Sequence, residues 1–493
     1  MIGKLKLPTL GVLALAEISA LLLVTALPAQ AQNETIIDNL LLNPTSRLTA
    51  DSAGNLYGTT GSLGAGGGTV YELSPSGRGG WNETVLYYLP GPGGPNSYLI
   101  FDSLGNLYGT TAGNYGGYGF VFENGTIIYS FTGGADGGNP CCGLVMDSAG
   151  NIYGMAGNVF ELSPSDGGWT EQVIYDGEAT GLAIDPAGSL FGVSSSTIFE
   201  LIPNGDGTWN PVILHTFPSG SKDGVTPHGV PALDGAGNLY GTTYGGGKYN
   251  YGTVYKLSPV TTGPHKGSWT EKILHSFRGG PLDGSGPEQG VMLDAEGNIY
   301  GTTSDGGKGT GGGTVFELAG PVGKGSYEEK ILWSFNVLDG FGPSALIMDS
   351  AGDLYGTASG GPYYWYDELP GIAFELNPSS APQIPRITSV SRISAQQSQT
   401  ITIKGSGFGN LAPFSGLSPF LCFYDHTGGW ITGCDLQGVD IGITVSSWTD
   451  SQIILGALGR APNVGDVVSF VVWSAQSGAV TDSRNYTVVA GPN

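Results

Sequence analysis

Histidines are the first residues to consider for acid–base or metal chemistry, and the sequence has five. Two of them share one place in a repeated pattern. In chain order that place holds Tyr129, Tyr175, His215, His275 and Trp333. Because large rings recur there, we expect His215 and His275 to be packing residues. The other histidines are His228 and His265, in expected loops, and His426.

Recognisable catalytic patterns do not occur. There is no His-x-x-x-His pair, no nucleophilic serine turn and no Cys-His pairing. The sequence therefore predicts no catalytic residue, no cofactor and no metal ligand, although groups from distant repeats could still meet in the folded chain.

Aspartates recur in two sets that are candidates for binding a cation. The first set opens turns of the form Asp-x-x-Gly and contains Asp51, Asp102, Asp147, Asp185, Asp234, Asp294 and Asp349. The second set precedes a glycine, with proline three residues beyond it, and contains Asp136, Asp223, Asp283 and Asp339. Neither set has the closely alternating carboxylates of a calcium loop. Capping of turn amides explains both sets, and a ligand or ion role stays open for the second.

Aromatic residues concentrate in glycine-rich loops. They are Tyr115, Tyr118, Tyr244, Tyr249, Tyr251, Tyr363, Tyr364, Trp365 and Tyr366, and the carboxylates Asp367 and Glu368 follow. Aromatic faces beside carboxylates suit sugar rings, so we predict a ligand-binding surface, with Trp365 stacked on the sugar. Packing of the rings over glycine backbone is the alternative.

The four cysteines form two pairs. Cys422 and Cys434 lie close together in one expected domain, and an oxidising compartment favours a disulfide between them. Cys141 and Cys142 are adjacent, and both a disulfide and two thiols are compatible with a turn. Neither pair has the spacing of a zinc site.

A repeat positions these residues. The segment that begins Asp51-Ser-Ala-Gly-Asn-Leu-Tyr-Gly-Thr-Thr60 occurs seven times, at steps of 38 to 60 residues. In the copy at Asp234, alternation and turn residues predict antiparallel strands at 229–233, 239–243, 253–257 and 269–277. Units of this length without helical periodicity predict β-propeller blades. Blade-to-blade loops and second-to-third-strand loops then share one face, where the Asp-Gly loops and aromatic loops converge.

The ends of the repeat array predict that the propeller is closed. The seventh unit lacks a fourth strand after residues 373–376, whereas residues 34–40 match the fourth strand at 271–277. The N-terminal strand would complete the last blade and remove two free sheet edges. We therefore predict an all-β, seven-bladed propeller over residues 32–378.

The repeat resembles a known family. Gly-Asn-Leu-Tyr-Gly-Thr-Thr, a Gly-Gly loop and Gly-Thr-Val-Phe/Tyr-Glu-Leu are similar to the GloVer tandem repeat of secreted bacterial proteins, over residues 45–378. The resemblance brings no biochemical activity and no functional residues with it.

A second domain follows the Ser/Pro-rich linker at 379–385. Residues 386–391, the Gly-Ser-Gly-Phe-Gly turn ending at Gly409, and the Trp-Thr-Asp turn at 448–450 resemble TIG/IPT domains. The resemblance implies an Ig-like β-sandwich over residues 386–493, without specifying a function.

The N-terminus and the charge indicate the compartment. Lys4 and Lys6, an apolar stretch at 18–27 and Ala29-Gln-Ala31 predict a signal peptide over residues 1–31, with an uncleaved anchor as the alternative. The chain carries a net charge of −23, and removal of this segment would leave −24. Such a charge repels nucleic acid and anionic lipid.

Together these features predict a secreted, monomeric protein that binds without catalysis. We expect its partner to be a glycan or a cell-surface protein, with no nucleic acid and no membrane insertion of the mature chain. The alternatives are a propeller enzyme acting on polysaccharide, as a lyase or hydrolase, and a purely structural surface protein.

Overall fold

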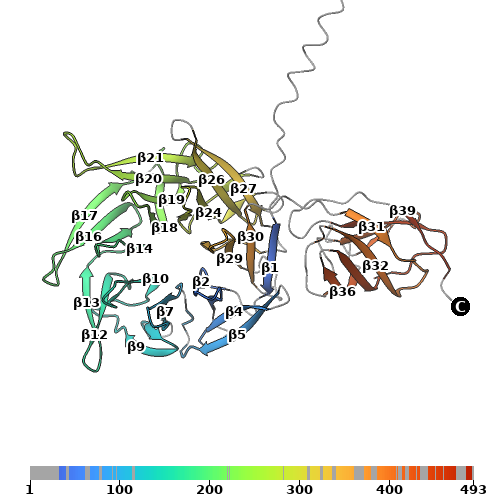
Figure 1. The fold of residues 1–493 in the computed structure, drawn as a ribbon, viewed down its shortest axis with the longest axis horizontal. Coiled ribbons are helices and arrows are strands. Elements are labelled where there is room, and N and C mark those ends of the chain that lie inside the picture. Colours follow the sequence, from blue (N-terminus) through green and yellow to red (C-terminus); the bar gives the residue numbers. More distant parts are fainter. Residues whose placement is uncertain are drawn as a thin grey trace, which may run out of the picture.

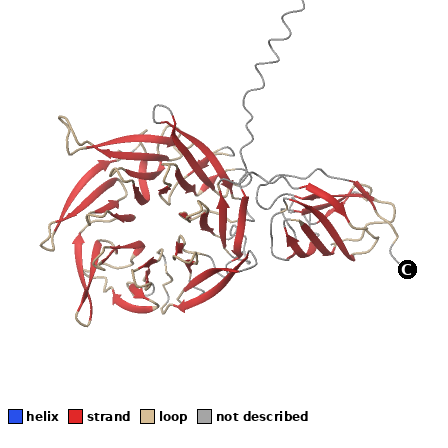
Figure 2. Cartoon of the chain, in the orientation of Figure 1, coloured by secondary structure: helices blue, strands red, loops and turns tan. Residues whose placement is uncertain are grey.

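The computed structural model contains strands and no helix among the residues that it describes, as expected for an all-β chain (Figure 2). No element of the described chain is therefore a helix that could cross a membrane. Outside the described residues lie 1–32, 40–43, 62–66, 77–79, 92, 96, 114–116, 219, 221, 281–282, 308–310, 323–325, 336–339, 360–370, 379–385, 407, 409–413, 417–420, 429, 433–441, 450, 459, 473–484 and 491–493.

Seven four-stranded antiparallel sheets follow one another around a ring in the described part of residues 33–377 (Figure 1). The first sheet contains β2 (Thr49–Ala50), β3 (Leu56–Thr60), β4 (Thr69–Ser76) and β5 (Gly80–Tyr88). The second contains β6 (Ile100–Phe101), β7 (Leu107–Thr111), β8 (Phe120–Glu123) and β9 (Thr126–Ser130). The third contains β10 (Cys141–Met146), β11 (Ile152–Met155), β12 (Val159–Ser165) and β13 (Gly168–Tyr175). The fourth contains β14 (Gly181–Ile184), β15 (Leu190–Val193), β16 (Thr197–Pro203) and β17 (Trp209–Thr216).

The fifth sheet contains β18 (Val225–Leu233), β19 (Leu239–Gly245), β20 (Thr253–Pro259) and β21 (Trp269–Ser276). The sixth contains β23 (Val291–Leu293), β24 (Ile299–Thr303), β26 (Thr314–Val322) and β27 (Ser326–Ser334), and the short strands β22 (Gly284–Ser285) and β25 (Asp305–Gly306) pair beside it. The seventh combines β28 (Ile347–Met348), β29 (Leu354–Ala358) and β30 (Ile372–Asn377) with β1 (Asn33–Asn39). In each sheet the first strand lies toward the middle of the ring and the fourth toward its outside (Figure 1).

A glycine opposite an aromatic residue explains the repeated Leu-Tyr-Gly-Thr-Thr segment. In the sixth sheet Gly301 pairs with Phe316 across β24 and β26, and a Cβ on Gly301 would lie 2.6 Å from the Phe316 ring. The other sheets repeat this pairing as Gly58 with Tyr71, Gly109 with Phe122, Gly154 with Phe160, Gly192 with Phe199, Gly241 with Tyr255 and Gly356 with Phe374. The missing side chain thus makes room for a buried ring in every sheet.

The first set of aspartates caps turns, as predicted. Asp51 Oδ1 accepts the N–H groups of Ala53 and Asn55, and Oδ2 accepts the Asn55 amide and the Tyr57 hydroxyl at 2.8 and 3.0 Å. Gly54 supplies the positive φ, 85°, that this tight turn requires. The fixed sequence of these turns is therefore explained by their own hydrogen bonds.

The two ends of the array meet. β1 pairs antiparallel with β30, so the predicted N-terminal strand does complete the seventh sheet. A second contact agrees, because a Cβ on Gly371 would overlap Pro44. Earlier seams have the same glycine–proline contact, at Gly119 with Pro140, Gly252 with Pro287 and Gly313 with Pro343. The last sheet thus meets the first by the same contact that joins these neighbours.

The described part of residues 386–490 forms two further antiparallel sheets. The five-stranded sheet has the order β31 (Arg386–Val390), β32 (Ser398–Ser406), β37 (Gln452–Ala457), β36 (Ile443–Thr449) and β33 (Phe414–Gly416). The four-stranded sheet has the order β35 (Trp430–Thr432), β34 (Leu421–Asp425), β38 (Val467–Val472) and β39 (Asn485–Thr487). Their buried faces share one core, which includes Ile403, Phe423 and Phe470.

Candidate binding site at the seam between the fifth and sixth sheets

The connection from β21 to β23 carries a buried carboxylate and supports an exposed aromatic surface. It is described at residues 278–280 and 283–290. Asp283 is 3% exposed, and its carboxylate accepts the N–H of Arg278 at 2.8 Å and the N–H of Gly284 at 2.7 Å. These two bonds fix the Asp283 side chain inside the seam, consistent with its predicted role in the turn.

Asp283 meets a histidine and a glutamate from the two flanking sheets, and we call His275, Asp283 and Glu329 the His–carboxylate cluster. His275 Nε2 lies 3.6 Å from Asp283 Oδ2 and 3.5 Å from Glu329 Oε2. The ring also packs on Phe277, with the ring centroids 4.7 Å apart, as expected for a packing residue. The histidine thus has a polar neighbourhood in addition to its packing contact.

Burial and the neighbouring groups together determine which of the two carboxyl groups in this cluster is ionised. Burial, and then the neighbouring Asp283, raise the pKa of Glu329 to about 9. Burial alone would also raise the pKa of Asp283, but the nearby His275 and Glu329 and the Arg278 N–H lower it overall. At neutral pH and without a bound cation, the two carboxyl groups therefore hold one proton between them, on the Glu329 side.

The seam between the fourth and fifth sheets repeats the arrangement with a looser geometry. His215 Nε2 lies 3.6 Å from Glu271 Oε2, and Asp223 is exposed in the connecting loop. Burial lowers the pKa of His215, against the influence of Asp223. Burial and Asp223 raise the pKa of Glu271 to about 7. Although the separation would suit an ion pair, burial disfavours both charges.

The seam between the second and third sheets has a tyrosine in place of the histidine. The Tyr129 hydroxyl donates a hydrogen bond to Asp136 Oδ2 at 3.1 Å. Burial and then Asp136 raise the pKa of Glu171. One position on an outer strand, the Asp-Gly loop and one position on the next outer strand thus form a recurring trio.

From the sequence alone, the histidines and the Asp-Gly loops are treated as separate features, and a glutamate next to both is not predicted. A signal was present, because Glu171, Glu271 and Glu329 share one place in the repeat, four residues before Tyr175, His275 and Trp333. The Asp-Gly loop adjoins each glutamate only in the assembled ring, where the loop belongs to the preceding sheet.

Three of the predicted aromatic residues gather on the same connection, and we call Tyr244, Tyr249 and Tyr251 the tyrosine surface. Their exposed fractions are 46%, 37% and 49%. The Tyr251 ring lies over Gly279 and the Tyr244 ring over Gly286, where an added Cβ would come within 3.2 and 3.0 Å of the rings. The rings of Tyr244 and Tyr251 therefore pack on glycine with one side, as in the alternative interpretation, and remain partly exposed.

Tyr249 lies beside two cations. Lys248 Nζ is 5.0 Å and Arg278 Cζ is 5.4 Å from the centre of its ring. A hydrogen bond with Lys248 and the charges of both cations lower the pKa of the Tyr249 hydroxyl. This local excess of positive charge stands out in a chain with 18 Lys and Arg against 41 Asp and Glu.

The remaining predicted residues do not join this surface. Tyr118 is 45% exposed and packs over Gly133 and Gly138 at the seam between the second and third sheets. Tyr115, Tyr363, Tyr364, Trp365, Tyr366, Asp367, Glu368, Asp339 and Cys434 lie outside the described residues, so the aromatic cluster around Trp365 and the disulfide of Cys434 with Cys422 stay predictions.

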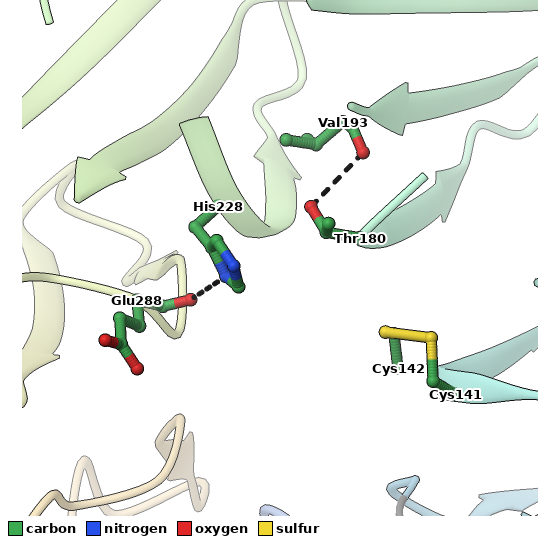
Figure 3. Close-up of a disulfide and its surroundings, with 6 residues drawn as sticks. All are labelled: Cys141, Cys142, Thr180, Val193, His228 and Glu288. Atoms are coloured by element: carbon green, nitrogen blue, oxygen red, sulfur yellow. Dashed lines mark hydrogen bonds between the residues drawn. A yellow bond between two sulfur atoms is a disulfide. The ribbon is translucent and has the colours of Figure 1, made fainter. Parts of the chain in front are cut away.

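A second group of polar residues lies on the inner strands and in the loops next to them (Figure 3). Cys141 and Cys142 form a disulfide at the start of β10, which resolves the choice between disulfide and thiols that the sequence left open. His228 Nδ1, on β18, lies 3.1 Å from the backbone oxygen of Glu288. Burial raises the pKa of Glu288, against the influence of His228. The paired carboxyl groups of the trios lie elsewhere, toward the outside of the ring.

A cavity of about 260 Å³ lies between the inner parts of the fifth, sixth and seventh sheets. Residues 230–233 and 289–293 line it, and Arg47 is the one charged side chain among its described lining. The Arg47 guanidinium already lies 3.8 Å from the centre of the Tyr98 ring. The cavity therefore offers no pair of acid and base groups.

Comparison with known proteins agrees with the repeat. The Gloeobacter/Verrucomicrobia repeat model matches residues 178–408, somewhat less than half of the chain. The chain therefore carries this tandem repeat, and the match extends beyond residue 378, where we expected the repeat to end. No curated protein matches the sequence.

Similar solved structures are distant. A streptogramin B lyase is 14% identical with a TM-score of 0.43, covering 69% of this chain and 96% of its own. The extracellular domain of BT4673 from B. thetaiotaomicron is 12% identical with a TM-score of 0.42, covering 94% of this chain and 60% of its own. The Dos1 propeller is 8% identical with a TM-score of 0.40, covering 70% and 94%.

Proposed function

We propose that the chain is an extracellular, non-catalytic binding protein that recognises an acidic glycan through the tyrosine surface. The observation that carries the proposal is the position of Tyr249, exposed and flanked by Lys248 and Arg278. Sugar rings present flat C–H faces that stack on aromatic rings, and a guanidinium pairs with a sugar carboxylate through parallel hydrogen bonds. A glycan made of uronic acids offers both groups in one repeating unit.

Charge favours an acidic ligand over a neutral one. The whole chain carries −23, so an anion approaches it against a repulsive field and needs a local cationic site in order to bind. Lys248 and Arg278 provide that site beside the aromatic rings, and no such cation lies at the described ring of Tyr118 in the second sheet. Binding through cations that are partly exposed should weaken as salt is added.

The finer description of the molecule belongs to the same proposal. The seven sheets and the β1–β30 pairing support a seven-bladed β-propeller closed by its N-terminal strand. The two sheets around one core in residues 386–490 support an Ig-like TIG/IPT-type sandwich. The signal peptide, secretion and a monomeric state are expectations from sequence that fit a glycan-binding protein outside the cell.

Calorimetric titration of the full secreted chain tests this function. We expect an oligogalacturonate to bind and the neutral oligogalactoside of equal length to bind far more weakly. Tyr249→Ala should weaken binding of the acidic sugar about fivefold, which corresponds to the loss of about 1 kcal/mol of stacking. Tyr118→Ala removes an equally exposed tyrosine from another seam and should leave the affinity unchanged.

The outcomes separate the alternatives. Equal affinity of the parent and Tyr249→Ala places the site elsewhere, with the loop around Trp365 as the next candidate. New reducing ends or unsaturated products in the same mixture would support the enzyme alternative. Binding to an acidic cell-surface protein without binding to any glycan would support a protein partner.

A further inference from the structure

We propose that His275, Asp283 and Glu329 form a binding site for a divalent transition-metal ion of the Zn²⁺ type. The three groups come from β21, the following loop and β27, and one potential ligand atom from each lies within 4.8 Å of the other two. The inference concerns a different part of the seam from the tyrosine surface and does not depend on the proposed function.

The separations from His275 are compatible with ligands of one ion. The 3.5 and 3.6 Å between His275 Nε2 and the two carboxylate oxygens exceed the 2.7–2.9 Å or so of a charge-assisted hydrogen bond. Two atoms bonded to zinc at about 2.1 Å in a tetrahedral site lie about 3.4 Å apart. The two separations from His275 thus match those expected around one ion, and the third separation, between the two carboxylates, is within 4.8 Å.

Two polar atoms of the cluster make no hydrogen bond. His275 Nε2 and Glu329 Oε1, the second oxygen of that carboxylate, are both inaccessible to solvent, and neither has a hydrogen-bond partner among the described residues. Leaving buried polar atoms unsatisfied costs free energy, and a metal ion would satisfy both. The side chains of His275 and Glu329 are still 16% and 18% exposed, which leaves a path for the ion.

Two other seams hold the same trio with one member changed, although Glu171 Oε1, His215 Nε2 and Glu271 Oε1 likewise lack a hydrogen-bond partner among the described residues. Tyr129 has a phenol in place of the imidazole, and its hydroxyl donates directly to Asp136. At the seam between the fourth and fifth sheets, which we call the fourth seam, His215 is present, but Asp223 is exposed whereas Asp283 is buried. Among the described trios, a histidine, a buried aspartate and a glutamate thus come together only at the seam between the fifth and sixth sheets, which we call the fifth seam.

The donor set selects the class of metal. One imidazole and two carboxylates suit Zn²⁺ and its neighbours in the first transition row, whereas Ca²⁺ and Mg²⁺ prefer sites made of oxygen alone. Two negative carboxylates and a neutral imidazole would balance the charge of a divalent ion. Arg278 is the nearby cation that opposes it, and its guanidinium lies at the exposed ring of Tyr249.

A metal ion here would act as a clamp. It would tie the outer strands of two sheets to the loop that supports Tyr244 and Tyr251. Its contribution to stability would appear when metal is added, because an ion that binds only the folded chain shifts the unfolding equilibrium.

Metal binding to the full mature chain tests the site. Zn²⁺ would be added by calorimetric titration to protein stripped with a chelator, and Co²⁺ would be used for its visible absorption. His275→Tyr is the informative variant, because the repeat already accommodates tyrosine at this position in Tyr129 and Tyr175. His215→Tyr, the same change at the neighbouring seam, is the matched control.

We expect the parent and His215→Tyr to bind one equivalent of Zn²⁺ that His275→Tyr does not bind. The absorption of tetrahedral Co²⁺ and the rise in melting temperature with Zn²⁺ should be lost in His275→Tyr and in Glu329→Gln. Equal metal content of the parent and a folded His275→Tyr would overturn the proposal. Loss of the equivalent in His215→Tyr, or equally tight binding of Ca²⁺ at the same site, would overturn it as well.

Discussion

Replacement of Glu271 by glutamine should make the protein more stable at alkaline pH, because burial opposes ionisation of this carboxyl group. Its pKa is raised from 4.5 to about 7 by burial and by Asp223. A group with a raised pKa in the folded state holds its proton while the unfolded chain has lost it. The contribution of Glu271 to the free energy of unfolding is therefore most favourable below pH 4.5. It falls as the pH rises from 4.5 to 7 and is constant above that range.

The size of this effect on the free energy of unfolding follows from the pKa shift of Glu271. Each pKa unit corresponds to about 1.4 kcal/mol, so an ionised Glu271 costs up to about 3 kcal/mol at pH 8 and about 1 kcal/mol at pH 5. The Glu271 side chain is 11% exposed, so solvent screening reduces this figure only a little. Glutamine resembles the protonated acid and should remove the effect. Relative to the parent, Glu271→Gln should gain about 2–3 kcal/mol between pH 5 and pH 8.

Urea unfolding of both proteins at the two pH values measures this gain. Taking the difference between the pH values cancels any constant effect of fitting an amide into the site. Glu178→Gln, at an exposed position, controls for the removal of one negative charge from a chain of −23. A stability difference between Glu271→Gln and the parent that is the same at pH 5 and pH 8 would refute the reasoning. It would mean that water or a counter-charge reaches the Glu271 carboxylate.

Three further predictions concern the fold. Deleting β1 exposes the edge of β30, so gel filtration should show aggregation and thermal unfolding should lose its single sharp transition; an unchanged melting temperature would contradict the role of β1. Gly301→Ala forces a methyl group against a buried ring and should cost about 1–3 kcal/mol in urea unfolding, while Gly235→Ala, which meets no atom within 4 Å, should cost much less. Mass spectrometry of the unreduced secreted protein should find Cys422 linked to Cys434, and two free thiols there would exclude this bond.

The strands and turns could be predicted because their determinants are local. The Asp51 turn is fixed by hydrogen bonds within seven residues, and the Gly301–Phe316 pairing joins adjacent strands. The joining of the two ends was also predictable, although it spans more than 300 residues, because the segment absent from the last unit was found at residues 34–40. In a repeat protein, a contact between distant segments can be predicted by aligning the segments with the repeat unit.

The His–carboxylate cluster could not be predicted in the same way, because its members depend on the relation between neighbouring sheets. Glu329 follows His275 by more than 50 residues and has its own position in the next unit. Inspection of one unit shows a ring, an aspartate and a glutamate at three separate places, each with a local explanation. Only the assembled ring places the glutamate of one sheet beside the histidine and loop of the sheet before it.

The difference between positions within a sheet and positions between sheets explains where the residue types of this repeat protein can change. Positions within a sheet are constrained, because a side chain on Gly301 would displace a buried ring and loss of Asp51 would leave turn amides unpaired. Positions at the seams are less constrained, since Tyr129, His215 and His275 all fit the same place beside a glutamate of the next sheet. A substitution at one of these positions therefore alters one seam without disturbing the others, although each unit contributes its glutamate and its ring to two different seams. The seam between the fifth and sixth sheets differs from the other two described trios in its buried aspartate, and the cations beside Tyr249 lie on the same connection. These are the differences on which a binding site can be built.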